Sequence, residues 1–288
     1  MFVNVNVLLL LLVTVVWGTT FPLLKSASST LSGLEITALR FAVAGIAMLP
    51  FALKATRATW RDGAVLGALA LLSYVAQAVG LEYISSNRSA FLTSLNVLMV
   101  PFLGLLFGGR LSALMVGAAT LACAGIGLMS WDGGAHLLGD AITIACALAY
   151  ALYVIVLSQR AGRHEARQLA ATQIVLMALF ALLWMLVADA RNDSLASLGT
   201  RALPHLDTVL YLGLVASAGM LFLQAVAQRH VSADKAAIIY AMEPVFAALF
   251  GWLWLAEILT LQAAIGGALV VLAVILSELK PAVAQSTG

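Results

Sequence analysis

Apolar residues dominate the chain in long runs that are separated by short polar turns. A run of about 20 apolar residues is long enough to cross a bilayer as an α-helix. The longest polar gap, residues 189–205, is too short to form an extramembrane domain with an enzyme active site. The pattern therefore predicts an all-α polytopic membrane protein with ten transmembrane helices, at roughly 5–25, 34–54, 63–83, 88–108, 112–131, 138–158, 168–188, 206–228, 235–256 and 260–279.

The composition excludes a soluble protein. Of the 288 residues, 63% are hydrophobic and only 10% are charged, whereas a soluble domain carries about 25% charged residues. The mean hydropathy is +1.05. The formal net charge of +2 does not indicate a nucleic-acid partner, because the basic residues lie mainly in the loops between predicted spans. The expected surroundings of the chain are a lipid bilayer.

Basic residues are distributed unequally over the two sets of loops. With both termini in the cytoplasm, the opposite side holds only Lys25, Arg88, Arg191 and Arg201, and the cytoplasmic loops hold Lys54, Arg57, Arg61, Arg110, Arg160, Arg163, Arg167, Arg229, Lys235 and Lys280. Because cytoplasmic loops are enriched in Lys and Arg, this bias predicts cytoplasmic N- and C-termini. No basic residue precedes Lys25, so the first apolar run is interpreted as an uncleaved span. The alanine- and leucine-rich composition favours a bacterial inner membrane.

A carboxylate and a proline interrupt the ninth predicted span. Glu243 and Pro244 lie near the middle of the apolar run 235–257. A carboxylate in hydrocarbon costs about 2.5 kcal/mol or more, so such a residue usually faces a cavity and works there. A proline in mid-helix removes a backbone hydrogen bond and bends or breaks the helix. Glu243 is therefore interpreted as a proton carrier or as the group that binds a substrate ammonium; the alternative is a carboxylate that only holds helices together.

Two stretches of the chain, 85–112 and 232–259, are weakly similar at an offset of 147 residues. This alignment places span four on span nine and predicts two halves of five spans each, residues 1–134 and 135–288. Because five is odd, the second half is inverted, and inverted repeats hold a substrate site near the bilayer midplane. Chance similarity of two apolar helices is the alternative. The alignment pairs Ser85 with Ser232, Arg88 with Lys235, Ala90 with Ala237, Asn96 with Glu243, Gly104 with Gly251 and Arg110 with Glu257.

Polar and aromatic side chains inside the spans are few, and most fall in spans one, three, four, six, eight and nine. We expect these six spans to surround a central cavity, with Pro22 and Pro244 as hinges. Each polar group in the membrane needs a partner or water, so hydrogen bonds that only join helices are the alternative role for the amides. The candidate substrate-binding residues are Trp17, Phe21, Tyr74, Gln77, Asn96, Tyr150, Tyr153, Gln224, Tyr240 and Glu243.

Spans five, seven and ten carry almost no polar residues. Small residues in spans five and ten allow close helix packing, also against a second copy of the chain in a homo-oligomer. They are Ala118, Ala122, Gly125, Ala263 and Gly267. In span two, Arg40 is interpreted as a structural residue that snorkels to the interface or pairs with Glu35.

No cofactor or metal is expected. Cys123 and Cys146 lie inside apolar runs and are interpreted as small packing residues. The four histidines show no ligand spacing. The sequence has no glycine-rich phosphate loop and no paired catalytic groups in a suitable context, so neither ATP nor an enzyme activity is predicted.

Several short motifs occur in order along the chain. They are Trp17-Gly18, Leu39-Arg40-Phe41, Gly139-Asp140, Ala149-Tyr150-Ala151 and Glu243-Pro244-Val245-Phe246 running to Glu257. With these motifs the whole sequence resembles EamA-type members of the drug/metabolite transporter superfamily, and within it most resembles the YddG-type exporters of aromatic and other amino acids. The resemblance implies a ten-helix inverted-repeat fold and a cavity lined by spans one, three, four, six, eight and nine. Two departures are Arg110, where the family usually has Glu, and Asn96, where a proline-containing step is common.

The expected function is export of aromatic and other neutral amino acids and related metabolites by alternating access between the halves. Gln77, Asn96 and Gln224 would orient the polar head of the substrate, and the aromatic residues would hold its apolar part. Hydrophobic cationic drugs or nucleotide sugars on the same fold are the first alternative. A membrane scaffold or an intramembrane enzyme is the second.

Overall fold

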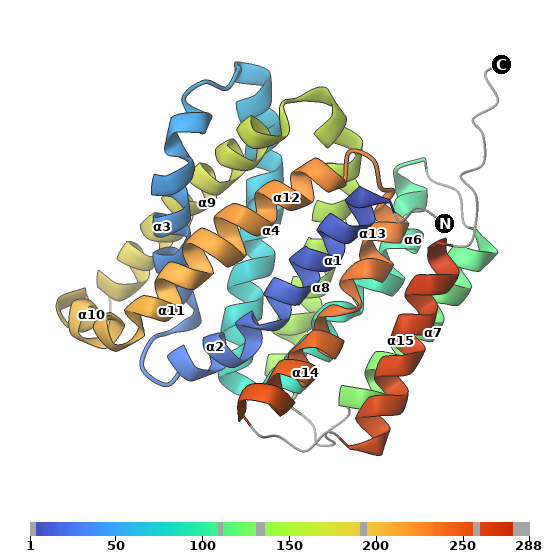
Figure 1. Ribbon diagram of the computed structural model, residues 1–288. Helices are drawn as coiled ribbons and strands as arrows, with labels where there is room; N and C mark the ends of the chain where they lie inside the picture. The colour runs from blue at the N-terminus through green and yellow to red at the C-terminus, as the bar shows by residue number, and fades with distance from the viewer. Residues whose placement is uncertain (1–3, 109–111, 131–135, 191–194, 256–259, 279–288) are drawn as a thin grey trace.

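The computed structural model describes residues 4–108, 112–130, 136–190, 195–255 and 260–278, and every regular element in these ranges is a helix. Figure 1 shows the helices assembled into one bundle. The first part of the chain forms α1 (Val5–Gly18), α2 (Thr20–Ala27), α3 (Gly33–Ala52), α4 (Arg57–Tyr83), α5 (Ser86–Ser94), α6 (Asn96–Leu106) and α7 (Ala113–Ser130).

The second part begins with α8 (Leu137–Arg160), a 3₁₀ turn η1 (Ala161–Arg163) and α9 (Ala166–Ala190). The remaining elements include a second 3₁₀ turn and a π-helix. They are α10 (Leu195–Ala202), η2 (Leu203–His205), α11 (Leu206–Leu210), the π-helix η3 (Tyr211–Gly219), α12 (Met220–Ala227), α13 (Ala233–Tyr240), α14 (Glu243–Leu255) and α15 (Leu261–Glu278). Arg110, Arg191, Glu257 and Lys280, which the sequence interpretation used, lie outside the described residues.

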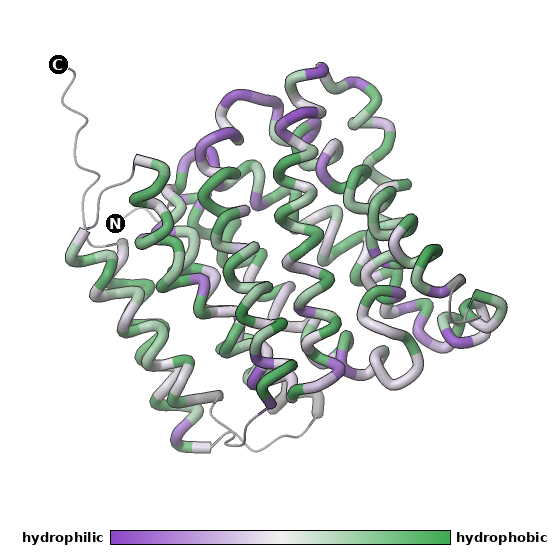
Figure 2. Tube along the Cα trace, turned by 180° about the vertical axis from the view of Figure 1, so that it is seen from behind, coloured by the Kyte–Doolittle hydropathy of each residue, from purple (hydrophilic) through white to green (hydrophobic). Residues whose placement is uncertain are grey.

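The described helices form a polytopic membrane protein. Seven stretches are long and apolar enough to cross a bilayer, and two shorter apolar helices, Ala113–Leu128 and Leu261–Ser277, coincide with the predicted spans 112–131 and 260–279. The remaining predicted span, 235–256, is divided between α13 and α14. Figure 2 shows hydrophilic residues gathered mainly at the two ends of the bundle and hydrophobic residues along the middle of the helices.

Side chains in the short turns cap the N-termini of several helices. Ser32, Thr56 and Ser85 precede α3, α4 and α5, and the hydroxyl of each accepts a hydrogen bond from a backbone N–H of the first turn. At Ser32, the Glu35 carboxylate also accepts from the Ser32 N–H, which completes a capping box. These caps satisfy N–H groups that a helix leaves without partners, so they fix where each span starts.

Three of the membrane segments are interrupted near their middle. The interruptions lie at Thr19 between α1 and α2, at Leu95 between α5 and α6, and at Ala241 and Met242 between α13 and α14. The predicted hinges Pro22 and Pro244 both lie in the first turn after a break. A proline costs no hydrogen bond there, so these residues stabilise the start of the second helix piece.

Helices from distant parts of the sequence pack together in the bundle. α3 packs against α9, α4 against α8 and α9, and α1 against α12, α13 and α14. At one edge of the bundle, α7 and α15 lie side by side (Figure 1). The small residues Ala118 and Ala122 are buried, and Gly125 lies against Gly266. The small residues of spans five and ten thus allow α7 and α15 of the same chain to pack closely against each other.

Gly125→Ala is expected to destabilise the protein, because the added Cβ would lie 2.6 Å from the Gly266 carbonyl oxygen and 2.9 Å from Leu269 Cβ. Overpacking of this kind costs about 1–3 kcal/mol. Gly117→Ala in the same helix is the matched control, since a Cβ there meets no described atom within 4 Å. Thermal unfolding of the purified proteins in detergent measures the difference, and equal melting temperatures for the two variants would contradict the close packing of α7 on α15.

Candidate functional site

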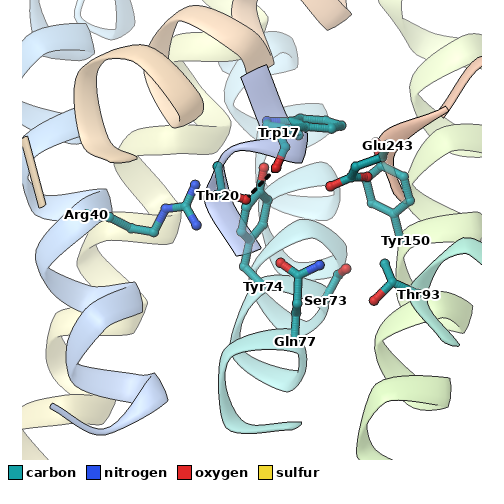
Figure 3. Close-up of a pocket in the computed structure, with 9 residues that line it drawn as sticks. All are labelled: Trp17, Thr20, Arg40, Ser73, Tyr74, Gln77, Thr93, Tyr150 and Glu243. Atoms are coloured by element: carbon teal, nitrogen blue, oxygen red, sulfur yellow. Dashed lines mark hydrogen bonds between the residues drawn. The ribbon is translucent and has the colours of Figure 1, made fainter. Parts of the chain in front are cut away.

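A cavity lies at the centre of the bundle, where the interrupted helices meet α3, α4 and α8 (Figure 3). The volume of this cavity, including the part that is open to the outside, is about 390 Å³. This is at the lower end of the range for small-ligand sites, and the central part has room for only a few water molecules. The lining residues are Trp17, Thr20, Arg40, Ser73, Tyr74, Gln77, Thr93, Tyr150 and Glu243.

The helix breaks bring polar groups to this cavity. Thr20 is the first residue of α2, Thr93 is in the last turn of α5, and Glu243 is the first residue of α14. Interrupted membrane helices are tolerated where the backbone lines a cavity, and transporters often place such interruptions at their substrate sites. The three breaks therefore mark the cavity as the candidate site.

Glu243 is the acidic group of the cavity. Its side chain points into the space between the helices (Figure 3), and the residue is 9% exposed. Within the described part of the chain its carboxylate takes part in no hydrogen bond or ion pair. The start of α14 provides a favourable field for a negative charge, because the helix dipole is positive at its N-terminus. A buried carboxylate with such surroundings can bind a proton or a positively charged ligand.

Arg40 occupies the opposite side of the same cavity (Figure 3). The residue is 2% exposed, and its Nε donates to Ser217 Oγ of η3 over 2.9 Å. Its guanidinium carbon lies 4.8 Å from the centre of the Tyr74 ring. Glu35 instead accepts from Arg201. The interpretation of Arg40 as a snorkelling or locally paired residue is therefore wrong: α9, α4 and η3 enclose α3 and bury this arginine.

Aromatic rings form the wall next to Glu243. Trp17 lies 6.0 Å from Tyr150 and 5.8 Å from Tyr240 between ring centroids, and Tyr150 lies 5.8 Å from Tyr240. The Trp17 indole N–H donates to the carbonyl of Ala216 in the π-helix over 2.9 Å. This hydrogen bond fixes a tryptophan deep in the bundle, so Trp17 presents a rigid apolar face to the cavity.

Several predicted site residues lie beside the cavity in a buried hydrogen-bond network. Tyr150 accepts from Gln224 (3.1 Å), Tyr153 donates to Gln224 (3.2 Å), and Gln173 donates to Tyr153 (3.3 Å). Next to it, Tyr240 donates to Gln228 (3.2 Å). Only Tyr150 of these residues also lines the cavity. The network therefore joins α8, α9, α12 and α13 beside the site. Gln173 shows that span seven contributes an interior polar group, which the sequence interpretation did not include.

The two other candidate residues, Phe21 and Asn96, are buried but are not among the residues that line the cavity. Asn96 begins α6, and its side-chain amide donates to the Thr93 carbonyl over 2.7 Å. Its Oδ1 has no hydrogen-bond partner in the described residues. Five of the ten predicted residues thus line the cavity: Trp17, Tyr74, Gln77, Tyr150 and Glu243.

Ion pairs connect distant segments at both ends of the bundle. At the end where α4 begins, the Asp62 carboxylate forms an ion pair with Arg160 (2.7 Å) and a hydrogen bond with His164 (2.8 Å). At the opposite end, Arg88 pairs with Asp140 (2.7 Å), and Glu35 pairs with Arg201. Each of these pairs joins a residue before position 134 to one after it. The described residues hold no cluster that could bind a metal ion, and Cys123 and Cys146 are free thiols.

Comparison with known proteins identifies the family. The model of the EamA-like transporter family matches residues 4–131 and again residues 137–279. An uncharacterized transporter of Archaeoglobus fulgidus is 30% identical over 94% of this chain and 85% of its own length. The uncharacterized transporter YvbV of Bacillus subtilis is 25% identical over 95% of this chain and 91% of its own length. A solved crystal structure has the same fold, with a TM-score of 0.76 at 16% identity over 96% of this chain and 98% of that one. The chain belongs to the EamA-like transporter family.

Proposed function

We propose that this protein exports amino acids, aromatic and other neutral ones, together with related small metabolites. The central cavity carries this proposal, because it combines the buried carboxylate of Glu243, which has no partner in the described ranges, with aromatic walls from Trp17, Tyr74 and Tyr150. The carboxylate would attract an ammonium group, and the rings would contact an apolar side chain. Such a substrate matches the aromatic amino acid exporters that the sequence resembles.

The two halves, residues 1–134 and 135–288, are proposed to be inverted repeats of five membrane segments each. The family model matches once in each half. α5 begins at Ser86 and α6 at Asn96, and α13 and α14 begin 147 residues later, at Ala233 and Glu243. The break between α5 and α6 therefore has its counterpart between α13 and α14, at the offset that aligns the two stretches of sequence.

Helix contacts support the same repeat. In this scheme α4 corresponds to η3 and α12, and α8 corresponds to α1. The contact of α4 with α8 then has its counterpart in the contact of α12 with α1, and both are present. The pairs α3 with α9 and α7 with α15 join corresponding segments to each other. A two-fold relation between the halves would produce this pattern.

Alternating access is the proposed mechanism. The cavity lies between two ends that are each held by ion pairs from one half to the other. Opening one end requires its pairs to break while those at the other end persist. Because the cavity has room for only a few water molecules in this conformation, binding of an amino acid requires the halves to move apart.

A bacterial inner membrane with both termini in the cytoplasm is the proposed location. The distribution of Lys and Arg supports this orientation. In Figure 1, α1 begins and α15 ends at the end of the bundle where α4 begins, as an even number of crossings requires. Asp62, Arg160 and His164 would then lie at the cytoplasmic end.

Hydrophobic cations are the second candidate cargo, because a single buried carboxylate next to aromatic rings also suits a cationic drug. Nucleotide sugars fit less well, since the described cavity holds one arginine for two phosphates. A scaffold without transport activity would leave the unpaired carboxylate without a role.

Transport in proteoliposomes tests the proposal. Purified protein is expected to release preloaded labelled phenylalanine, tyrosine and leucine at rates well above those of protein-free liposomes. Parallel vesicles loaded with a cationic dye or with a nucleotide sugar test the alternative cargoes. Release of the dye alone would assign a drug exporter, and release of no compound would overturn the proposed function.

A further inference from the structure

Two side chains of opposite charge face the central cavity, and neither has an ionised partner among the described residues. They are Arg40 of α3 and Glu243 of α14, the only charged residues among the nine that line it. Elsewhere in the bundle the acids Glu35, Asp62 and Asp140 each pair with a basic side chain. The charges at the cavity are therefore arranged differently from the charges that join helices.

The guanidinium of Arg40 is held in place but incompletely satisfied. Its Nε donates to Ser217 Oγ, and one face stacks over the Tyr74 ring. Its Nη2 is buried and has no hydrogen-bond partner in the described residues. A guanidinium presents several donors in one plane, which match the two oxygens of a carboxylate. The hydrogen bond of Nε and the stacking on Tyr74 thus hold the guanidinium in place, and its Nη2 remains available to bind an anion in the cavity.

Arg40 and Glu243 point into the cavity from opposite sides, with Tyr74 between them (Figure 3). They form no ion pair with each other, so each charge is available to a ligand. We propose that Arg40 binds the carboxylate and Glu243 the ammonium of one zwitterionic substrate, so that this pair of residues selects free amino acids. The inference rests on the proposed transport function and specifies its substrate class.

This arrangement discriminates against the alternative cargoes by charge. A hydrophobic cation would satisfy Glu243 but would face the uncompensated guanidinium of Arg40. A simple carboxylate would satisfy Arg40 but would face the carboxylate of Glu243. Because like charges in a buried site repel strongly and unpaired charges there are costly, only a ligand with both charges satisfies both residues.

Competition against release of labelled phenylalanine, with the wild-type protein in proteoliposomes, tests the selection. The competitors are phenylalanine, phenylalanine methyl ester, phenethylamine and 3-phenylpropanoate, which share one ring and differ in charge. We expect unlabelled phenylalanine to compete at least about tenfold more strongly than the other three, because a site with buried polar groups rejects ligands that leave them unpaired. Equal competition by the ester or the amine would overturn the inference while leaving amino-acid transport intact.

Two substitutions are expected to shift the ligand preference of the site in opposite directions. Arg40→Gln is expected to lower phenylalanine transport and to raise the relative competition by phenethylamine, and Glu243→Gln is expected to raise that of 3-phenylpropanoate. Arg40→Lys keeps the charge and should retain part of the preference for the zwitterion. If Arg40→Gln does not fold, the wild-type competition and Arg40→Lys still decide the question. An unchanged order of competitors in folded Arg40→Gln and Glu243→Gln would overturn the pairing, whereas no transport of phenylalanine by wild type would overturn the proposed function itself.

Discussion

Glu243→Gln is expected to reduce amino-acid flux in proteoliposomes by at least about tenfold. Gln has nearly the same shape as Glu, so the packing at the start of α14 is preserved while the charge is removed. If the carboxylate carries a proton or binds the substrate ammonium, its neutralisation removes that interaction. A pH gradient separates the two roles: a proton carrier makes the flux of the wild type, but not that of the variant, depend on the gradient, whereas a group that only binds the ammonium leaves both independent of it.

The stability of the same variant separates a functional from a structural role. The Glu243 carboxylate takes part in no hydrogen bond or ion pair in the described residues and is 9% exposed, so burying its charge is unfavourable. We expect Glu243→Gln to unfold at a temperature about 2–4 °C higher than wild type, which corresponds to roughly 1 kcal/mol. A carboxylate that holds helices together predicts the reverse, a lower melting temperature. Unchanged flux together with reduced stability would show that Glu243 is structural.

The membrane segments could be predicted from the sequence, because apolar runs of about 20 residues are rare outside membrane-spanning helices. The break before α14 was also detectable, since Glu243 and Pro244 interrupt the run. The break at Leu95 has no such signal: the nearest proline, Pro101, lies inside α6. It becomes visible only through the repeat, because Leu95 lies 147 residues before Met242.

The cavity residues could be predicted only in part, because spacing along a helix gives a face but not its neighbours. Tyr150 and Tyr153 are three positions apart, which rotates them by about 60°, and only Tyr150 reaches the cavity. Thr20 could not be singled out from the sequence, because its hydroxyl donates to the Trp17 carbonyl three residues earlier, as threonines commonly do in membrane helices. The surroundings of Arg40 could not be predicted, because its hydrogen-bond partner Ser217 is 177 residues away in the sequence.

Asp62→Asn is expected to give the second large effect, a loss of about 2–3 kcal/mol in stability. Its carboxylate holds Arg160 and His164 at the end of the bundle where α4 begins, and its side chain is 8% exposed. Breaking a fully buried ion pair costs about 3–5 kcal/mol, and the cost is lower here because the Arg160 side chain is 30% exposed. Thermal unfolding in detergent measures the loss.

Glu165→Gln is the matched control for Asp62→Asn, because it removes an acid–arginine pair at the start of α9, near the same end of the bundle. Glu165 and Arg167 are 47% and 53% exposed, and exposed pairs contribute about 0–1 kcal/mol. Comparable losses of stability in the two variants would show that the Asp62 cluster (Asp62, Arg160 and His164) stabilises the protein no more than an exposed pair does.

The same pair of variants tests alternating access through a native thiol. Cys146 is buried beside the cavity, where its sulfur contacts Ser73 over 3.3 Å. If the Asp62 cluster closes one end, its loss shifts the population toward a conformation open at that end. Alkylation of Cys146, measured with Cys123→Ser in the background, should then accelerate several-fold in Asp62→Asn and remain unchanged in Glu165→Gln. An unchanged rate in both would mean that the cavity does not open where α4 begins when these ion pairs break.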